Sequence, residues 1–213
     1  VAIIGLAGGT IARQYSIVYP QAQIDGVEID PAIVAVGRRY FGMTEPNLHV
    51  TTADGRTFMR VTKQTYDVVA IDAFQQPYIP FQLTTKEFFQ EIRSHMGPDG
   101  VLCLNTGHTA TDFRLVQAFV NTLSLVFPTV FTFNVPNTFN TEVMATMRPT
   151  TLATFAANLA TAPANSLLPV VAGEALPVAR LAHAQKGGIV FTDDQAPVEQ
   201  LTDQLLIDYI QQH

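Results

Sequence analysis

The chain begins with VAIIGLAGGTIARQY, residues 1–15, and this stretch decides the fold class. Residues 1–5 form an apolar run that predicts a buried β-strand, and residues 10–20 have the pattern of a helix. Three glycines fall between the two elements: Gly5, Gly8 and Gly9. Glycine allows a tight turn and lets the backbone approach a ligand where a Cβ atom would clash. The stretch therefore indicates a nucleotide-type turn, and the rest of the sequence narrows the ligand.

Strand-like and helix-like segments alternate through the first two thirds of the chain. The predicted strands are residues 1–5, 24–29, 48–53, 66–72, 101–106, 129–135 and 141–147. The predicted helices are residues 10–20, 30–41, 54–61, 84–96 and 112–127, and some helix is expected within 150–190. Alternation that ends in a hairpin predicts an α/β fold. We expect a doubly wound, mostly parallel seven-stranded sheet with helices on both faces and an antiparallel last strand, a Rossmann-like arrangement.

Composition limits the function classes. A chain of 213 residues with 47% hydrophobic and 14% charged residues is expected to form a single globular domain, residues 1–213. No apolar run approaches the roughly 20 residues needed to span a bilayer, so no membrane contact is expected. The net charge is −6 and only Arg38 and Arg39 are adjacent basic residues, which predicts no nucleic-acid partner. The single Cys103 fits a reducing compartment, hence a cytoplasmic location, and is expected to be a buried core thiol.

Glycine or carboxylate side chains follow four consecutive predicted strands. They are Gly5 to Gly9, then Glu28 and Asp30, then Asp54 with Gly55, and finally Asp72. Because ligands of parallel sheets bind outside the carboxyl ends of the strands, these groups are expected at one rim. Each alone has a plain structural explanation, such as a helix cap at Asp30. Together they favour a nucleoside site, with Glu28 accepting hydrogen bonds from ribose hydroxyls and Asp54 reaching the adenine amino group.

Several other chemistries lack their motifs. The spacing of the first glycines does not match G-x-G-x-x-G, which disfavours a nicotinamide dehydrogenase, and no G-K-[ST] of a P-loop occurs. The five histidines have no paired metal spacing, so no metal site is expected. No G-x-S-x-G nucleophile elbow exists. The ligand that still fits the predicted nucleoside site is an adenosyl group, carried by S-adenosylmethionine or a related compound.

A set of motifs resembles one known family. The motifs are GLAGGTIAR (5–13), GVEIDP (26–31), ADGRTFM (53–59), YDVVAIDAF (66–74), IPFQLTTKEFF (79–89) and TDDQAPVE (192–199). Together they resemble the spermidine synthase-like (polyamine aminopropyltransferase) branch of the class I methyltransferase fold. This branch includes domains that occur alone or fused to membrane transport segments in bacteria.

The resemblance implies a set of binding and catalytic residues. The expected contacts to the donor are Gly5, Ala7, Gly8, Gly9, Glu28, Ile29, Asp54, Gly55 and Asp72. Asp72 matches the first acid of a D-x-x-D stretch whose carboxylate activates the attacking amine, which must be neutral to attack. The donor is expected to be S-adenosylmethionine or its decarboxylated form, and the acceptor a small amine. Gln75 and Tyr78 are candidate acceptor contacts, or together with Gln76 a polar lid. The family resemblance also makes a homodimer the expected assembly.

Two departures from the family pattern leave alternatives open. Gly8 stands where the family carries an acid that contacts the aminopropyl amine of the donor, and Gln75 replaces the second acid of D-x-x-D. The family's N-terminal β-rich domain is also expected to be absent. The leading interpretation is transfer of an aminopropyl or related alkyl group to an amine. A methyltransferase that uses intact S-adenosylmethionine is the second, and a non-catalytic nucleoside-binding domain of a transporter fusion is the third.

Two further sites carry structural expectations. His108 follows the fifth predicted strand, where a core position is favoured over one that faces the site. Asp193 and Asp194 precede the last helical region, and helix capping is expected to explain at least one of them.

Overall fold

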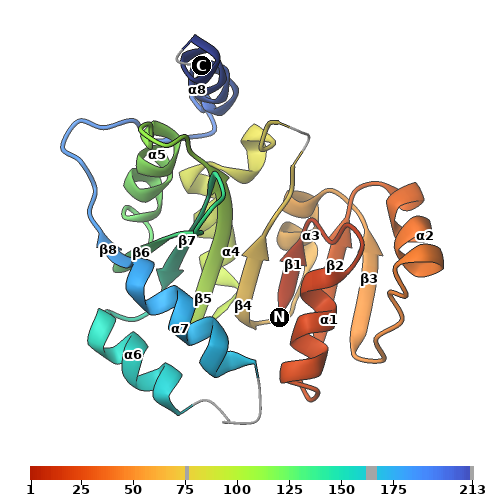
Figure 1. The fold of residues 1–213 in the computed structure, drawn as a ribbon. Helices are drawn as coiled ribbons and strands as arrows, with labels where there is room; N and C mark the ends of the chain where they lie inside the picture. Colours follow the sequence, from red (N-terminus) through yellow and green to blue (C-terminus); the bar gives the residue numbers. More distant parts are fainter. Residues whose placement is uncertain (75–76, 162–166, 212–213) are drawn as a thin grey trace.

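The computed structural model describes residues 1–74, 77–161 and 167–211, and its centre is one eight-stranded sheet (Figure 1). Its strands are β1 (Ala2–Ile4), β2 (Ile24–Glu28), β3 (Leu48–Thr52), β4 (Tyr66–Ile71), β5 (Met96–Gly107), β6 (Thr129–Asn134), β7 (Asn140–Thr146) and β8 (Ala179–Ala182). The strand order is β3-β2-β1-β4-β5-β7-β6-β8. The first five strands pair in parallel, whereas β7 is antiparallel to both β5 and β6. The doubly wound fold is therefore confirmed, and the strand order reverses between β1 and β4.

The structure departs from the predicted elements at two places. β8 is an additional strand that pairs antiparallel with β6 in the segment of unclear pattern, residues 150–190. It is four residues long, too short for an alternating pattern to reveal it. The predicted helix 84–96 ends earlier, at Ser94, because Met96 already pairs with Tyr66 of β4. A register shift follows, so β5 extends back through MGPDG instead of beginning at Val101.

Helices alternate with most of the strands along the chain. They are α1 (Thr10–Val18), α2 (Pro31–Tyr40), α3 (Gly55–Val61), α4 (Lys86–Ser94), α5 (Arg114–Leu123), α6 (Leu152–Ala160), α7 (Leu168–Val178) and α8 (Val198–Gln211), with a short 3₁₀ helix η1 (Phe81–Leu83). The predicted cap of α2 is confirmed: the Asp30 side chain accepts a hydrogen bond of 2.7 Å from the Ala32 amide. Among the described residues, no helix is long and apolar enough to cross a membrane.

The hydrophobic core is divided between the two faces of the sheet. The largest cluster joins the sheet to α3, α4, α5 and α8, and it contains the fully buried Phe88, Phe89 and Phe119. On the other face, where α1 and α7 lie in front of the sheet in Figure 1, there are two separate clusters. One joins β1 and β2 to α1 and α2, and the other joins β6 and β8 to α6 and α7. The two clusters leave the middle of this face less densely covered.

Candidate functional site

A cavity of about 910 Å³ lies at the carboxyl ends of the parallel strands, and we call it the rim cavity. Of the residues singled out in the sequence, Gly5, Ala7, Glu28, Ile29, Asp54, Gly55 and Asp72 line it. The strand-end argument thus brings together groups from four strands at one place. Gly8 and Gly9 are not part of the lining, and Gln75 lies outside the described residues.

The glycine loop after β1 is shaped by close backbone contacts. Gly5 has a φ of 91°, and a Cβ atom there would lie 2.4 Å from the carbonyl oxygen of Asp72. Gly9 has a φ of 82°, and its Cβ would lie 2.7 Å from Met43 Cγ. The loop therefore lies against the residues that follow β4 and α2, and both glycines have a positive φ that L side chains rarely adopt. Ala7 between them also has a positive φ of 46°, which turns its amide toward β2.

The side chain of Glu28, at the end of β2, is hydrogen-bonded to the glycine loop. Its side chain accepts hydrogen bonds from the Ala7 amide at 2.9 Å and the Asp30 amide at 3.2 Å, and the residue is 7% exposed. Each carboxylate oxygen has a second lone pair, so Glu28 retains acceptor capacity toward the cavity that it lines. The position suits an acceptor for two vicinal hydroxyls.

Asp54 and Gly55 form the next part of the rim at the start of α3. The Asp54 side chain accepts a hydrogen bond of 2.8 Å from the Thr57 amide. Burial acts to raise the pKa of Asp54, but the hydrogen bonds, chiefly from Thr57, outweigh it and lower the pKa. Asp54 is therefore a carboxylate at neutral pH. Gly55 is packed tightly, because a Cβ atom there would lie 2.4 Å from Ile4 Cγ2.

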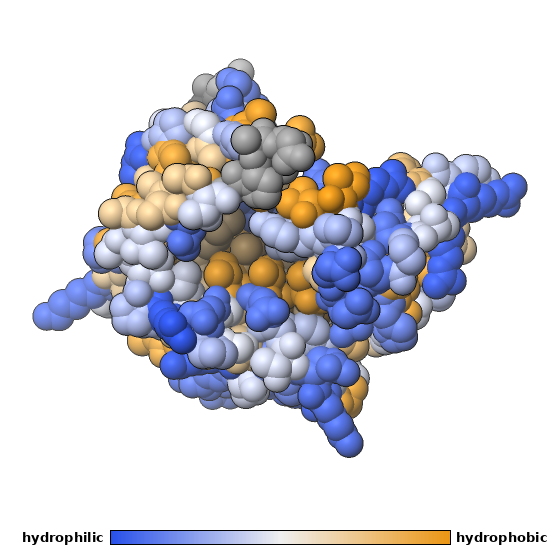
Figure 2. All heavy atoms as spheres, turned by 90° about the horizontal axis from the view of Figure 1, so that it is seen from below, coloured by the Kyte–Doolittle hydropathy of each residue, from blue (hydrophilic) through white to orange (hydrophobic). Residues whose placement is uncertain are grey.

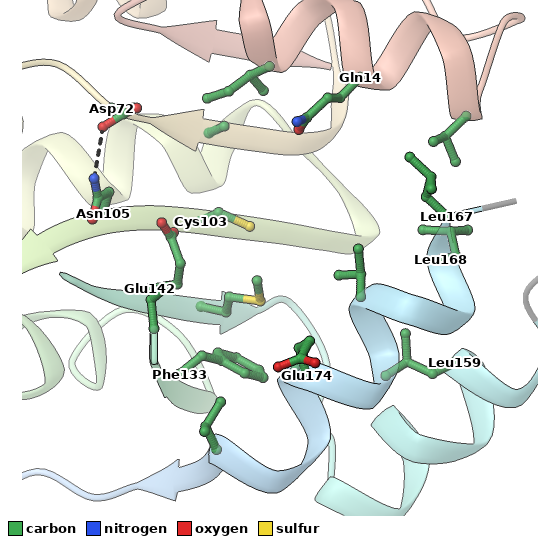
Figure 3. A pocket seen from close by; sticks show the side chains of 18 of the residues that line it. Gln14, Asp72, Cys103, Asn105, Phe133, Glu142, Leu159, Leu167, Leu168 and Glu174 are labelled. Atoms are coloured by element: carbon green, nitrogen blue, oxygen red, sulfur yellow. Dashed lines mark hydrogen bonds between the residues drawn. The ribbon is translucent and has the colours of Figure 1, made fainter. Parts of the chain in front are cut away.

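Asp72 is held by a partner that the sequence did not reveal. Its backbone amide donates to the carbonyl oxygen of Ile4 at 2.9 Å, and its Oδ1 accepts a hydrogen bond of 3.1 Å from Asn105 Nδ2 (Figure 3). Asn105 lies on β5 and lines the rim cavity, and its Oδ1 is buried with no partner among the described residues. The signal for Asn105 was available, since it lies toward the carboxyl end of the next parallel strand.

Beside this pair lies a carboxyl group, Glu142, in a mainly apolar environment. Glu142 of β7 is directly opposite Asn105 in the antiparallel register. Burial, and then the charge of Asp72, raise the pKa of Glu142 to about 7. Burial also raises the pKa of the free Cys103 thiol, to about 12, with a further contribution from Glu142. The raised pKa disfavours the thiolate, but the expected core position is wrong, because Cys103 is only partly buried and lines a cavity.

Tyr78 and His108 are turned to other partners. The Tyr78 hydroxyl donates to Asp203 of α8 at 2.7 Å, and Tyr78 is not part of the rim cavity's described lining. His108 is 8% exposed and stacks on Phe113 with 4.5 Å between ring centroids. It does not line the rim cavity either, in agreement with the favoured core position.

The expectation that at least one of Asp193 and Asp194 caps the last helix is wrong, because neither residue directly precedes that helix. Helix α8 begins only at Val198, and Asp193 instead binds the buried Arg56 guanidinium, with 2.7 Å between Oδ1 and Nη1. Thr85 donates to the same Oδ1 at 2.7 Å, and Arg56 also contacts Glu91 at 2.8 Å. This network fixes the C-terminal segment to α3 and α4 behind the rim.

No group of three or more His, Cys, Asp or Glu side chains within the described part of the chain is arranged to hold a metal ion. What the rim offers instead is carboxylates and amides around an open cavity next to a glycine turn. This combination of fold and site defines an α/β domain of the class I methyltransferase type.

Within that class the family is established by sequence. The family model described as the spermine/spermidine synthase domain matches residues 1–156, and the chain belongs to this family. Among curated relatives, a probable polyamine aminopropyl transferase of Bifidobacterium longum is 39% identical over 147 residues, which are 67% of this chain and 32% of that protein. A polyamine aminopropyltransferase of Vibrio vulnificus is 34% identical over 149 residues, 68% of this chain and 49% of the relative. The chain therefore spans about a third of the length of the first relative and about half of the length of the second.

Solved structures agree on the fold. A probable spermidine synthase from Corynebacterium glutamicum superposes with a TM-score of 0.71 and 21% identity, covering 90% of this chain and 71% of that one. The human methyltransferase-like protein 13, solved in complex with SAH, superposes with a TM-score of 0.63 and 23% identity, covering 83% and 79%. One of these structures is named a probable spermidine synthase and the other a methyltransferase-like protein, although they share one fold. The fold therefore does not decide between aminopropyl and methyl transfer.

Proposed function

We propose that this domain is a transferase that binds an adenosyl sulfonium donor in the rim cavity and moves an aminopropyl or related alkyl group to an amine. The observation that carries the proposal is the position of Asp72. It lines the cavity together with Glu28 and Asp54, and Asn105 fixes its carboxylate. The sequence similarity to polyamine aminopropyltransferases supports the same reaction class.

In the proposed reaction each residue has a distinct role. Glu28 accepts the ribose hydroxyls and Asp54 contacts the adenine, while the glycine loop lets the donor lie close to the backbone. The amine nitrogen attacks the carbon next to the sulfonium sulfur, so that a C–N bond forms and the C–S bond breaks. The electron pair of that bond stays on the sulfur, which leaves as a neutral thioether. Asp72 accepts the proton that the nitrogen loses, and positioning supplies much of the rate.

The glycine at position 8 favours methyl transfer as the second candidate reaction. Gly8 removes the carboxylate that would pair with the amine of a decarboxylated donor. A Cβ atom at Gly8 would lie 3.3 Å from Phe41 Cγ, so an acid at this position requires a small movement of that ring. Phe41 is 56% exposed, so the ring has room to move. Changing Gly8→Asp is therefore expected to shift donor preference toward the decarboxylated form.

Calorimetric titration distinguishes the candidates. The protein is titrated with S-adenosylmethionine, its decarboxylated form and methylthioadenosine. Preference for the decarboxylated donor supports aminopropyl transfer, and preference for the intact donor supports methyl transfer. Binding of nucleoside without any turnover of a panel of amines supports the non-catalytic domain. Folded protein that binds none of the three ligands would contradict the adenosyl site itself.

The remaining features of the proposal follow the family. The acceptor is a small-molecule amine, the domain occupies residues 1–213, and the assembly is a homodimer in the cytoplasm. Gln75 and Tyr78 stay candidate acceptor contacts; Tyr78 requires release from Asp203 to serve as one. Size-exclusion chromatography with light scattering tests the assembly.

A further inference from the structure

A second cavity lies beside the rim cavity, on the face of the sheet that carries α1 and α7, and we call it the face cavity. Its volume is about 690 Å³, and its described walls come from α1, β4, β5, β6, β7, α6 and α7. Asp72 and Asn105 line both cavities, so the face cavity reaches the same carboxylate from another direction. Figure 2 shows a hollow with hydrophobic side chains inside it and hydrophilic ones around it.

The face cavity exists because of how the sheet is packed. Side chains alternate along β5, so Leu102 and Leu104 enter the large core while Cys103 and Asn105 point to the opposite face. On that face the clusters under α1 and under α7 are separate, and neither contains a residue of β4 or β5. The cavity occupies the interval between them (Figure 3).

The side chains that line the face cavity favour a ligand that has a positive charge and an apolar body. Most of the lining is aliphatic or aromatic, including Leu159 near the C-terminal end of α6 and Leu167 directly before α7 (Figure 3). The charged groups in the described lining are all carboxylates, Asp72, Glu142 and Glu174, and none of the lining residues described is Lys, Arg or His. An ammonium group near Asp72 and Glu142 would offset the cost of burying their charge.

One unsatisfied atom marks the end at which the nitrogen would lie. Asn105 Oδ1 is buried without a hydrogen-bond partner among the described residues, while its Nδ2 is bound to Asp72. Buried polar atoms are normally paired, so an unpaired acceptor beside two carboxylates suits an N–H donor from a ligand. Asn105, Asp72 and Glu142 thus form a polar end, and the rest of the described lining is mainly hydrocarbon, with the carboxylate of Glu174 at an exposed position of α7.

We propose that the face cavity binds the acceptor as a primary amine with an apolar body, an alkylamine or arylalkylamine, and presents its nitrogen to Asp72. This inference rests on the proposed transferase function. The transfer is then attack of this nitrogen on the donor carbon, with loss of one proton to Asp72 and departure of the thioether. Away from the polar end, Glu174 is the one charged residue in the described lining and its position is exposed, so the further ammonium groups of a polyamine would lie mostly against hydrocarbon walls, which is unfavourable. Helix α7, a principal wall, lies outside residues 1–156, the part of the chain that the family model matches.

Titration with amines of rising length tests the proposal. Butylamine, hexylamine and octylamine are titrated into the protein, alone and saturated with methylthioadenosine, beside the diamine 1,8-diaminooctane. Affinity is expected to rise about two- to fourfold per added methylene, and octylamine should bind at least tenfold more tightly than the diamine. Equal affinity for octylamine and the diamine, or no dependence on chain length, overturns the proposal.

Paired variants place the binding in the cavity. Val171→Trp narrows it, whereas Val170→Trp alters a neighbouring exposed residue on the same helix that does not line it. The first is expected to weaken octylamine binding at least tenfold and the second less than twofold, with methylthioadenosine binding unchanged in both. Glu142→Gln should likewise weaken octylamine more than methylthioadenosine. Loss of amine binding in both Trp variants overturns the location.

The two proposals fail in different ways. Methylthioadenosine that binds while none of the amines does would overturn the face cavity as an acceptor site and leave the rim cavity intact. Amines that bind with the expected length dependence while no adenosyl ligand does would retain the cavity and contradict the transferase.

Discussion

Asn105 and Asp72 are joined by a hydrogen bond of 3.1 Å between neighbouring parallel strands, and this bond lies where the two cavities meet. Asn105, 33 positions further along the chain, thereby holds Oδ1 of Asp72 toward β5. The other carboxylate oxygen of Asp72 is left for a ligand. The arrangement couples the orientation of the proposed base to the strand that also faces the acceptor.

Removing the Asn105 donor should reduce turnover more than donor binding. In Asn105→Ala the Asp72 carboxylate loses its orienting bond, and misplacement of a catalytic group by about 1 Å costs up to about 100-fold in rate. We expect kcat to fall about 10- to 100-fold, with the dissociation constant for methylthioadenosine changed less than threefold. Asn105→Asp keeps the shape but adds a like charge next to Asp72, so it should be at least as impaired. Full turnover in either variant would show that the bond has no catalytic role.

Glu28 is expected to carry much of the nucleoside affinity. Glu28→Ala should weaken methylthioadenosine binding by about 1–3 kcal/mol, because charge-assisted hydrogen bonds to the ribose are lost. The same change frees the amides of Ala7 and Asp30, so a thermal melt must accompany the calorimetry. Glu28→Gln keeps one acceptor oxygen and should be intermediate. Unchanged affinity in a folded Glu28→Ala protein would show that the ribose lies elsewhere.

Glu142 should make stability fall as pH rises. Its pKa is raised from 4.5 to about 7 in the folded protein, so the folded state binds more protons than the unfolded state between these values. The stabilisation is fully present below about pH 4.5 and is lost as pH rises to about 7, by up to about 3 kcal/mol. Asp72, Cys103 and Glu174 line the same cavity as Glu142, and of these Asp72 contributes to its raised pKa.

Urea unfolding at pH 5 and pH 8 measures this effect. Glu142→Gln is expected to unfold with nearly the same free energy at both pH values, whereas the parent chain loses stability at pH 8. Glu174→Gln, at an exposed position of α7, is the control and should behave as the parent. A parent chain with no loss between the two pH values would mean that Glu142 is ionised without penalty.

The features that could be predicted from the sequence are those that depend on residues close together in the chain. The glycine turn, the Asp30 cap and the succession of strands along the chain as far as β7 depend on neighbouring residues and on simple periodicity, and all were predictable. Asn105 could have been identified because it lies toward the carboxyl end of a parallel strand. Its hydrogen bond to Asp72, however, depends on the pairing of β4 with β5. Asp193 was misassigned because a carboxylate before a helix has the pattern of a cap, while its partner Arg56 lies 137 residues away.

The Arg56 network should contribute more to stability than exposed ion pairs do. The Arg56 side chain is 8% exposed and contacts both Glu91 and Asp193, whereas Arg60 is 57% exposed and contacts Glu91 alone. Arg56→Ala leaves the carboxylates of Glu91 and Asp193, which are 25% and 42% exposed, without their charged hydrogen-bond donor, so it should cost about 1.5–3 kcal/mol of unfolding free energy. Arg60→Ala should cost less than about 1 kcal/mol.

The same network predicts how acid unfolds the protein. Hydrogen bonds from Arg56 lower the pKa of Asp193, and those from Arg56 and Arg60 lower the pKa of Glu91 despite its burial. Groups with lowered pKa contribute stability that is present above their unfolded pKa and is lost as pH falls through the folded value. Stability should therefore decrease below about pH 4 in the parent chain and more weakly in Asp193→Asn, measured by urea unfolding from pH 5 to pH 3. Equal acid sensitivity in the two proteins, or an Arg56→Ala cost no larger than that of Arg60→Ala, would show that the C-terminal segment is held by its hydrophobic contacts alone.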